Sequence, residues 1–300
     1  MIKIAYHPLY KHPLPEGHRF PMIKYELLPQ QLVHEGTALQ EDFFEPSLPN
    51  LDVVLAVHKK EYVDDLLQLT LDPKAARKIG FPLSSALVER ELRIANGTIL
   101  GTEFALQNGI SFNIAGGTHH AYTNRGEAFC LLNDQAIGAQ YLLNTYRFKR
   151  ILIVDLDVHQ GNGTAEIFKN NASVFTFSVH GKSNYPFKKE ISDLDIPLED
   201  NTSDVDYLNC IRHHLPQLIE SLQPDFIFYL AGVDILETDK LGKLSCTIEG
   251  CKKRDEIVLS HCFKNQIPVQ VSMGGGYSPD IKTIIEAHAN TYRVASAIFS

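Results

Sequence analysis

Several features that would place a protein in a membrane or outside the cell are missing from this sequence of 300 residues. No uninterrupted apolar stretch approaches the roughly 18 residues that a membrane-spanning helix needs. The first residues have no long apolar region and no cleavage site of the kind that a signal peptide carries. We therefore expect neither a membrane span nor secretion.

Positive charge is also scarce. Lysine and arginine number 28 against 36 aspartates and glutamates, which leaves a formal net charge of −8. A direct binder of nucleic acid or of an anionic membrane normally presents a basic field. The composition therefore predicts no direct nucleic-acid partner, and it leaves the oligomeric state open.

Tryptophan is absent, and the five cysteines contain no Cys-x-x-Cys pair. An odd number of unpaired cysteines is typical of reduced thiols, so we predict a cytoplasmic protein. The apolar fraction of 44% and the charged fraction of 21% are ordinary for a folded globular chain and exclude wholesale disorder.

Short β-branched runs alternate with longer segments of helical periodicity. This alternation predicts an α/β fold with three αβα layers, in which helices cover both faces of a mostly parallel central sheet. No repeat or linker divides the chain, so we predict a single domain over residues 1–300. The predicted strands are a short one at the N-terminus and then 53–57, 110–115, 151–156, 174–179, 226–231 and 267–273. The predicted helices include 87–107, 134–146, 205–222 and 248–263.

Polar or glycine-rich residues follow four of these strands. Ligands of open α/β sheets bind beyond the carboxyl ends of the strands. The four continuations are Gly-Gly-Thr-His-His at 116–120, Asp-Val-His-Gln-Gly-Asn-Gly at 157–163, Gly-Val-Asp at 232–234 and Gly-Gly-Gly-Tyr at 274–277. Because parallel strands end at one edge of their sheet, we expect these segments to converge on a single site.

Asp155, Asp157 and His159 occupy alternate positions at one strand end. Alternate side chains of an extended chain point the same way, and burial of these carboxylates without a cation or dense hydrogen bonding would be costly. Asp157 and His159, together with Asp234 from another strand end, would give three protein ligands and one open position, as in catalytic zinc sites. Asp155 would then support a nearby imidazole or the strand end. A simple helix-capping role for such an aspartate stays the alternative.

Two further strand ends carry groups suited to acid–base chemistry. His119 and His120 follow two glycines that allow a tight turn. Adjacent imidazoles near a metal suit proton transfer from water and to a leaving group. Tyr277 follows three glycines, and its phenol is suited to donate a hydrogen bond to a developing oxyanion. The glycine run lacks the lysine and hydroxyl residue of a phosphate loop, which disfavours nucleotide binding.

Together these motifs resemble the zinc-dependent histone deacetylase family, which has the arginase–deacetylase fold. The resemblance extends from about His7 to Tyr277 and rests on the segments 116–120, 129–134, 155–163, 232–234 and 275–277. The stretches 159–163 and 231–242 are most similar to class IV histone deacetylases and their bacterial relatives. The resemblance implies a metal-dependent hydrolase of linear amides that acts as a lysine deacylase.

The resemblance also implies a role for individual residues. One catalytic Zn²⁺ would be bound by Asp157, His159 and Asp234. His120 would act as general base and later as acid, with His119 as its partner held by Asp155. Tyr277 would polarise the scissile carbonyl and stabilise the oxyanion. The substrate-binding residues would be Phe129 and Tyr185 as opposite walls of the acyl-lysine tunnel, Gly276, and Arg19 as the inner-pocket arginine. A structural K⁺ would be held by the backbone around Asp155, Asp157, His159, Ser178 and Val179.

Two positions depart from the usual family pattern. Asn162 stands where many members have aspartate, so His120 faces a neutral partner and its pKa is expected to be lower than beside a carboxylate. The class IV pattern has the same asparagine. Ala128 precedes Phe129 where glycine is usual, which adds a methyl group beside the tunnel.

The predicted reaction removes acetyl or longer fatty acyl groups from lysine ε-amines of proteins or peptides. Small acetylated amines such as acetylpolyamines are the alternative substrates, because they need the same chemistry. An arginase-like pair of manganese ions is disfavoured, because Asp234 is followed by Ile-Leu-Glu without a second closely spaced aspartate. A non-catalytic acyl-amine binder is disfavoured as well, because neither Tyr277 nor any predicted ligand is missing.

Overall fold

A computed structural model describes residues 2–299 of the chain. Its centre is an eight-stranded sheet in which every neighbouring pair is parallel, in the order β2-β1-β3-β8-β7-β4-β5-β6. The central strands are buried on both faces, as their near-continuous apolar sequences predict. The strands are β1 (Lys3–Ala5), β2 (Phe43–Phe44), β3 (Ile110–Asn113), β4 (Ile151–Asp155), β5 (Val174–Gly181), β6 (Leu194–Leu198), β7 (Phe226–Leu230) and β8 (Val269–Ser272).

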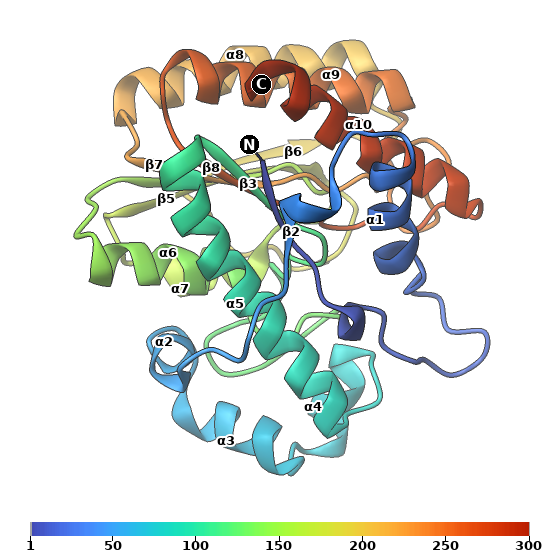
Figure 1. The fold of residues 1–300 in the computed structure, drawn as a ribbon, viewed down its shortest axis with the longest axis vertical. Coiled ribbons are helices and arrows are strands. Elements are labelled where there is room, and N and C mark those ends of the chain that lie inside the picture. Colours follow the sequence, from blue (N-terminus) through green and yellow to red (C-terminus); the bar gives the residue numbers. More distant parts are fainter. Residues whose placement is uncertain (1, 300) are drawn as a thin grey trace.

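Helices cover both faces of this sheet, and the apolar core fills the space between the layers (Figure 1). One outer layer contains α1 (Lys24–His34), α8 (Asp204–Leu222), α9 (Ile248–Lys264) and α10 (Ile281–Phe299). The other contains α5 (Ser85–Asn108), α6 (Asp134–Thr145) and α7 (Asn162–Phe168). The predicted three-layer α/β architecture is therefore confirmed.

Three short helices extend the layer of α5 away from the sheet (Figure 1). They are α2 (Leu51–Leu55), α3 (Lys60–Gln68) and α4 (Pro73–Ile79). Single 3₁₀ turns, η1 (Pro8–Tyr10) and η2 (Gln40–Asp42), lie in the connections near the N-terminus. Across residues 2–299, no helix combines the length and the apolar character that crossing a bilayer requires.

The strand predicted at 53–57 is wrong, because this segment forms helix α2. A short apolar run fits a buried strand and a buried helix equally well. Here Asn50 decides between them, since its side chain accepts a hydrogen bond from the backbone N–H of Asp52 and caps the helix. The edge strand β6 escaped prediction because Pro197, which disfavours a strand, lies within it.

The other predicted strands are confirmed, and the ends of those with predicted bounds differ by at most two residues; the four predicted helices are likewise confirmed within two. Their ends follow local chemistry. Helix α5, for example, begins after Ser84, whose hydroxyl accepts the N–H of Leu87, and it ends at Gly109 in a left-handed conformation.

Candidate functional site

The four strand ends singled out in the sequence lie side by side. Strands β3, β8, β7 and β4 are consecutive neighbours in the sheet. Their last residues form one row of register partners, in which Asn113 pairs with Ser272, Ser272 with Leu230, and Leu230 with Asp155. The polar segments that follow therefore leave the sheet from one edge and meet above it, as predicted.

The turn after β3 packs directly against the turn after β8. Gly117 has a φ of +97°, and a Cβ at this position would lie 2.9 Å from the backbone of Gly274. Asp134 holds the turn from the other side, since one of its carboxylate oxygens accepts the N–H groups of Gly117 and Thr118 at 2.9 and 2.8 Å. Only glycine permits this approach, and it fixes the direction in which the chain enters His119.

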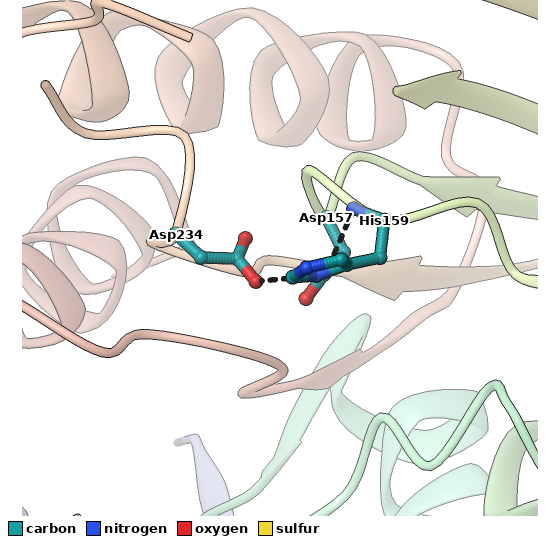
Figure 2. Close-up of side chains that lie close together, drawn as sticks. All are labelled: Asp157, His159 and Asp234. Carbon is teal, nitrogen blue, oxygen red and sulfur yellow. Dashed lines mark hydrogen bonds and ion pairs between the residues drawn. The ribbon is translucent and has the colours of Figure 1, made fainter. Parts of the chain in front are cut away.

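Asp157, His159 and Asp234 form a buried cluster at the centre of the edge. The Nδ1 atom of His159 lies 3.0 Å from Asp157 Oδ1 and 3.1 Å from Asp234 Oδ2, and the ligand atoms of the three residues all lie within 4.8 Å of one another. Figure 2 shows the imidazole between the two carboxylates. Backbone amides orient both acids, because Gly275 donates to Asp157 and Val158 donates to Asp234.

The electrostatics of this cluster suit a bound cation. Burial raises the pKa of Asp234 to about 7, and the Asp157 carboxylate adds to this effect. Burial disfavours the charged form of His159, but hydrogen bonds with the two carboxylates outweigh burial and raise its pKa to about 10. Two carboxylate oxygens and one imidazole nitrogen are a donor set that fits a divalent metal such as zinc, and the cation would relieve the repulsion between the acids.

His119 and His120 lie next to this cluster with different partners. His119 Nδ1 is 2.7 Å from Asp155, and His120 Nδ1 is 2.6 Å from the side-chain oxygen of Asn162. Burial lowers the pKa of His120 well below its ordinary value, and the charges of His119 and His159 add to this effect. Burial acts on His119 in the same direction, but the Asp155 carboxylate outweighs it and raises the pKa.

Tyr122 fixes the orientation of the Asn162 amide, and the sequence carried no signal for this role. Asn162 donates a hydrogen bond from Nδ2 to the Tyr122 hydroxyl at 2.9 Å, so its Oδ1 is left to accept from His120 Nδ1. The other ring nitrogen of a neutral His120 therefore carries the free lone pair. The guanidinium of Arg125 lies 3.5 Å from the centre of the Tyr122 ring and holds it in place.

Two cavities meet at this site. Five residues line both of them, namely His120, Ala128, Phe129, His159 and Tyr277. The inner cavity continues into the core between Phe20, Tyr25, Phe81, Arg90 and the strand end at 115–119. The outer cavity opens to the surface between Arg19, Lys78, Ser183, Asn184, Tyr185, Phe187, Leu241 and Lys243.

Tyr277 stands where the two cavities join. Its ring centre lies 6.5 Å from that of His159 and 5.8 Å from that of Phe20. Its backbone N–H donates to Asp239 at 2.6 Å. Burial raises the pKa of the phenol well above its ordinary value, and the charges of Asp234 and Asp157 add to this effect, so the hydroxyl stays protonated and able to donate.

Two of the residues predicted to bind substrate line the outer cavity as walls. Phe129 is buried, and the Tyr185 ring stands edge-on to His120 at 5.0 Å between centres. The Tyr185 hydroxyl donates to Glu127 at 2.5 Å. Ala128 has a φ of +44°, a left-handed conformation that explains physically why glycine is the usual residue here.

The position predicted for Arg19 is wrong. Arg19 is exposed, and its guanidinium lies over the Phe129 ring at 4.9 Å, on the surface side of the outer cavity. The arginine of the inner cavity is Arg90 from the second turn of α5, which is 2% exposed and donates to the carbonyl of Tyr10. Gly276 lines neither cavity, since its Cα faces Val233 and His288 instead.

One buried group and one half-buried group support the site and were not recognised as functional from the sequence. Lys24 is completely buried and donates from Nζ to the carbonyl of Gly274 at 3.1 Å, and burial lowers its pKa to about 8. Asp239 accepts the N–H groups of Leu241 and Gly242 as well as that of Tyr277. Only Asp239 had a local signal, the Asp-x-Leu-Gly sequence of a side-chain-stabilised turn.

The residues predicted to hold K⁺ lie on adjacent strands. Asp155, the last residue of β4, is the register partner of Ser178 within β5, and Val179 follows Ser178. Asp157 and His159 lie in the loop after β4. The K⁺ site itself stays a prediction.

Comparison with known proteins gives a consistent result. The model of the histone deacetylase domain matches residues 18–292. An uncharacterised protein of Picosynechococcus sp. is 44% identical over 296 residues, which cover 99% of both chains. Histone deacetylase 2 of Arabidopsis thaliana is 27% identical over 277 residues, covering 89% of this chain and 72% of the relative. Acetoin utilization protein AcuC of Staphylococcus aureus is 28% identical over 287 residues, covering 88% and 73%.

The fold is also that of a solved relative. A structure described as an HDAC homolog complexed with SAHA superposes with a TM-score of 0.85 at 24% identity, covering 99% of this chain and 84% of the other. This likeness confirms the predicted arginase–deacetylase fold. Since the domain model also spans nearly the whole sequence, the chain belongs to the histone deacetylase family of hydrolases that act on acetylated amides.

Proposed function

We propose that this protein is a zinc-dependent amidohydrolase that removes acetyl or longer fatty acyl groups from lysine ε-amines of proteins or peptides. The observation that carries the proposal is the buried cluster of Asp157, His159 and Asp234 beside two imidazoles and a phenol, at the base of a cavity that opens to the surface. We further propose that residues 1–300 form one catalytic domain, that it is of the class IV type, and that it works in the cytoplasm.

Asp157, His159 and Asp234 would hold the zinc ion. When bound, zinc supplies a Lewis acid that polarises the amide carbonyl and makes water more acidic. The raised pKa of Tyr277 supports its part, because a protonated phenol donates a hydrogen bond to the oxygen on which negative charge develops. Phe129 and Tyr185 would flank the aliphatic part of the acyl-lysine on its way through the outer cavity.

His120 would act as the general base. Its Nδ1–H is engaged by Asn162, so the free lone pair on the other ring nitrogen takes the proton of the attacking water. The same nitrogen then returns a proton to the leaving amine. Burial lowers the pKa of His120 well below its ordinary value, and the charges of His119 and His159 add to this effect, which favours a neutral imidazole before the reaction begins.

This assignment predicts the effect of Asn162→Asp on the pH profile. A carboxylate 2.6 Å from Nδ1 would stabilise the imidazolium of His120 and raise its pKa more than the hydrogen bond with the present, neutral amide does. Activity that needs a neutral base is lost as pH falls through that pKa. We therefore expect the acid limb of kcat/KM to move upward by about one pH unit or more.

The measurement is kcat/KM between pH 5 and 9, with Asn209→Asp as the control. Asn209 is exposed on α8 and its replacement adds the same charge. An acid limb that stays in place in Asn162→Asp would show that His120 is not the base.

The direct test of the proposed function combines metal analysis with turnover. We expect about one zinc ion per purified chain and hydrolysis of at least one lysine peptide in a series from acetyl to myristoyl, with N-acetylputrescine assayed alongside. Absence of hydrolysis of every member by zinc-loaded protein would contradict the proposal. Hydrolysis of N-acetylputrescine alone would assign the protein to small acylated amines instead.

A further inference from the structure

The mouth of the outer cavity carries positive charge only. Three cationic residues from separate segments line it, Arg19 before α1, Lys78 in the last turn of α4, and Lys243 between β7 and α9. We call these three residues the cationic rim. Among the described residues that line the cavity there is no carboxylate. The rim is thus opposite in sign to the chain as a whole, which has a formal net charge of −8.

Most of this charge is not neutralised within the protein. All three side chains are exposed, and neither Arg19 nor Lys78 forms an ion pair with a carboxylate of residues 2–299. Lys243 donates to the Ser183 hydroxyl at 2.9 Å and has only a distant carboxylate neighbour, Asp200 at 3.9 Å. The rim therefore keeps positive charge available to a ligand that enters the cavity.

The carboxylate that is hydrogen-bonded to the lining residue Tyr185 does not cancel this charge. Glu127 accepts a hydrogen bond from the Tyr185 hydroxyl with one oxygen and from Arg125 with the other. Both of its carboxylate oxygens therefore already accept hydrogen bonds within the protein.

The loop that forms one side of the mouth adds positive charge and an apolar group. Lys188 has no ion pair within the described chain, and Lys189 is held by the carbonyls of Asn184 and Pro186 rather than by an acid. Phe187, which precedes these lysines in the chain and lines the cavity, is 92% exposed. A ligand that binds over the mouth of the outer cavity would therefore contact several positively charged side chains and the exposed ring of Phe187.

We propose that the substrate is an acylated lysine in a protein segment whose neighbouring residues are acidic. This inference rests on the proposed deacylase function and specifies its substrate. The acyl-lysine side chain enters between Phe129 and Tyr185, while flanking carboxylates meet the rim. Electrostatic complementarity of this kind selects between partners and speeds their encounter. Basic segments and acetylated polyamines carry the same sign as the rim and are disfavoured.

The test compares three acyl-lysine peptides of equal length with acidic, neutral or basic flanking residues. We expect kcat/KM to fall in that order, by on the order of tenfold between the acidic and the basic peptide at low salt. The difference should shrink in 0.5 M NaCl, because exposed charges are screened. N-acetylputrescine should be a poorer substrate than the acidic peptide.

Charge reversal assigns the preference to the rim. In Lys78→Glu and Lys243→Glu, the ratio of kcat/KM for acidic over basic peptide should fall severalfold. Lys264→Glu is the matched control, because this exposed lysine ends α9 just before β8 begins, at the opposite edge of the sheet. Its ratio should equal that of the unaltered protein.

Three results would overturn the inference, namely equal or faster turnover of the basic peptide, a preference for N-acetylputrescine, or a ratio that neither charge reversal changes. If none of these substrates is hydrolysed at all, the proposed deacylase function fails instead.

Discussion

Asp234→Ala is expected to lose its zinc and, with it, all measurable turnover. Asp234 is completely buried, and its two oxygens do different work, one accepting the N–H of Val158 and the other facing His159 Nδ1 at 3.1 Å. Removing it leaves only two of the three predicted ligands. A zinc site with two protein ligands is too weak to survive dialysis against a chelator, whereas sites with three ligands are ordinary catalytic sites.

The measurement is the metal content after dialysis, together with the thermal midpoint in the presence and absence of zinc. A ligand that binds only the folded state raises its stability by mass action. Added zinc should therefore raise the Tm of the unaltered protein and should not change the Tm of Asp234→Ala.

Two further variants separate ligand loss from misfolding. Asp234→Asn keeps the size of the side chain and an oxygen for the N–H of Val158, so it should fold and still bind zinc far more weakly. Asp64→Ala removes an exposed carboxylate on α3 and should retain both zinc and turnover. Stoichiometric zinc and normal turnover in Asp234→Asn would show that Asp234 is not a ligand.

The edge of the sheet that carries the candidate site was predictable from local patterns, but the order of the strands along it was not. Each of the four strand ends has a polar or glycine-rich continuation that is visible in the sequence. Their meeting depends on β8 and β7 inserting between β3 and β4, and this order follows from packing across more than a hundred residues of chain. The fold class and the cluster could be predicted because parallel strands share an edge in any order.

The alternation of Asp155, Asp157 and His159 was only partly informative. Strand β4 ends at Asp155, and beyond it the extended geometry is lost. Asp155 consequently turns to His119, while Asp157 and His159 face Asp234. The alternating pattern identifies the three candidate residues. Tertiary contacts decide that Asp155 supports His119, whereas Asp157 and His159 belong to the cluster with Asp234.

The side chains that support the site through hydrogen bonds could hardly be identified from the sequence around them. Lys24 reaches a carbonyl 250 residues away, and Tyr122 reaches an asparagine 40 residues away. The misplacement of Arg19 has the same cause. Phe20 turns inward and Arg19 outward, so the arginine of the inner cavity comes from α5 instead. No periodicity in a loop predicts which of two neighbouring side chains is buried.

Tyr277→Phe is expected to keep its zinc and to lose turnover by about 10² to 10³ in kcat, with little change in KM, as removal of one oxyanion donor does elsewhere. The hydroxyl donates to no partner within residues 2–299, although the ring is packed against Phe20 and Phe129. Tyr277 is half-buried and lines both cavities, so its hydroxyl is accessible where they join. The phenol is therefore free to donate a hydrogen bond to a group that arrives with the substrate.

The same observation predicts that the variant is as stable as the unaltered protein, because no internal hydrogen bond is lost and the ring remains. The role of the Tyr277 hydroxyl is tested by measuring three properties of Tyr277→Phe, namely its steady-state kinetics, its zinc content and its Tm. Tyr146→Phe serves as the control, since it removes an exposed hydroxyl at the C-terminal end of α6 that donates to Glu103 of α5. A loss of kcat with unchanged zinc and unchanged Tm separates transition-state stabilisation from structural damage. Undiminished turnover would remove Tyr277 from the mechanism, and loss of zinc would instead make it part of the metal site.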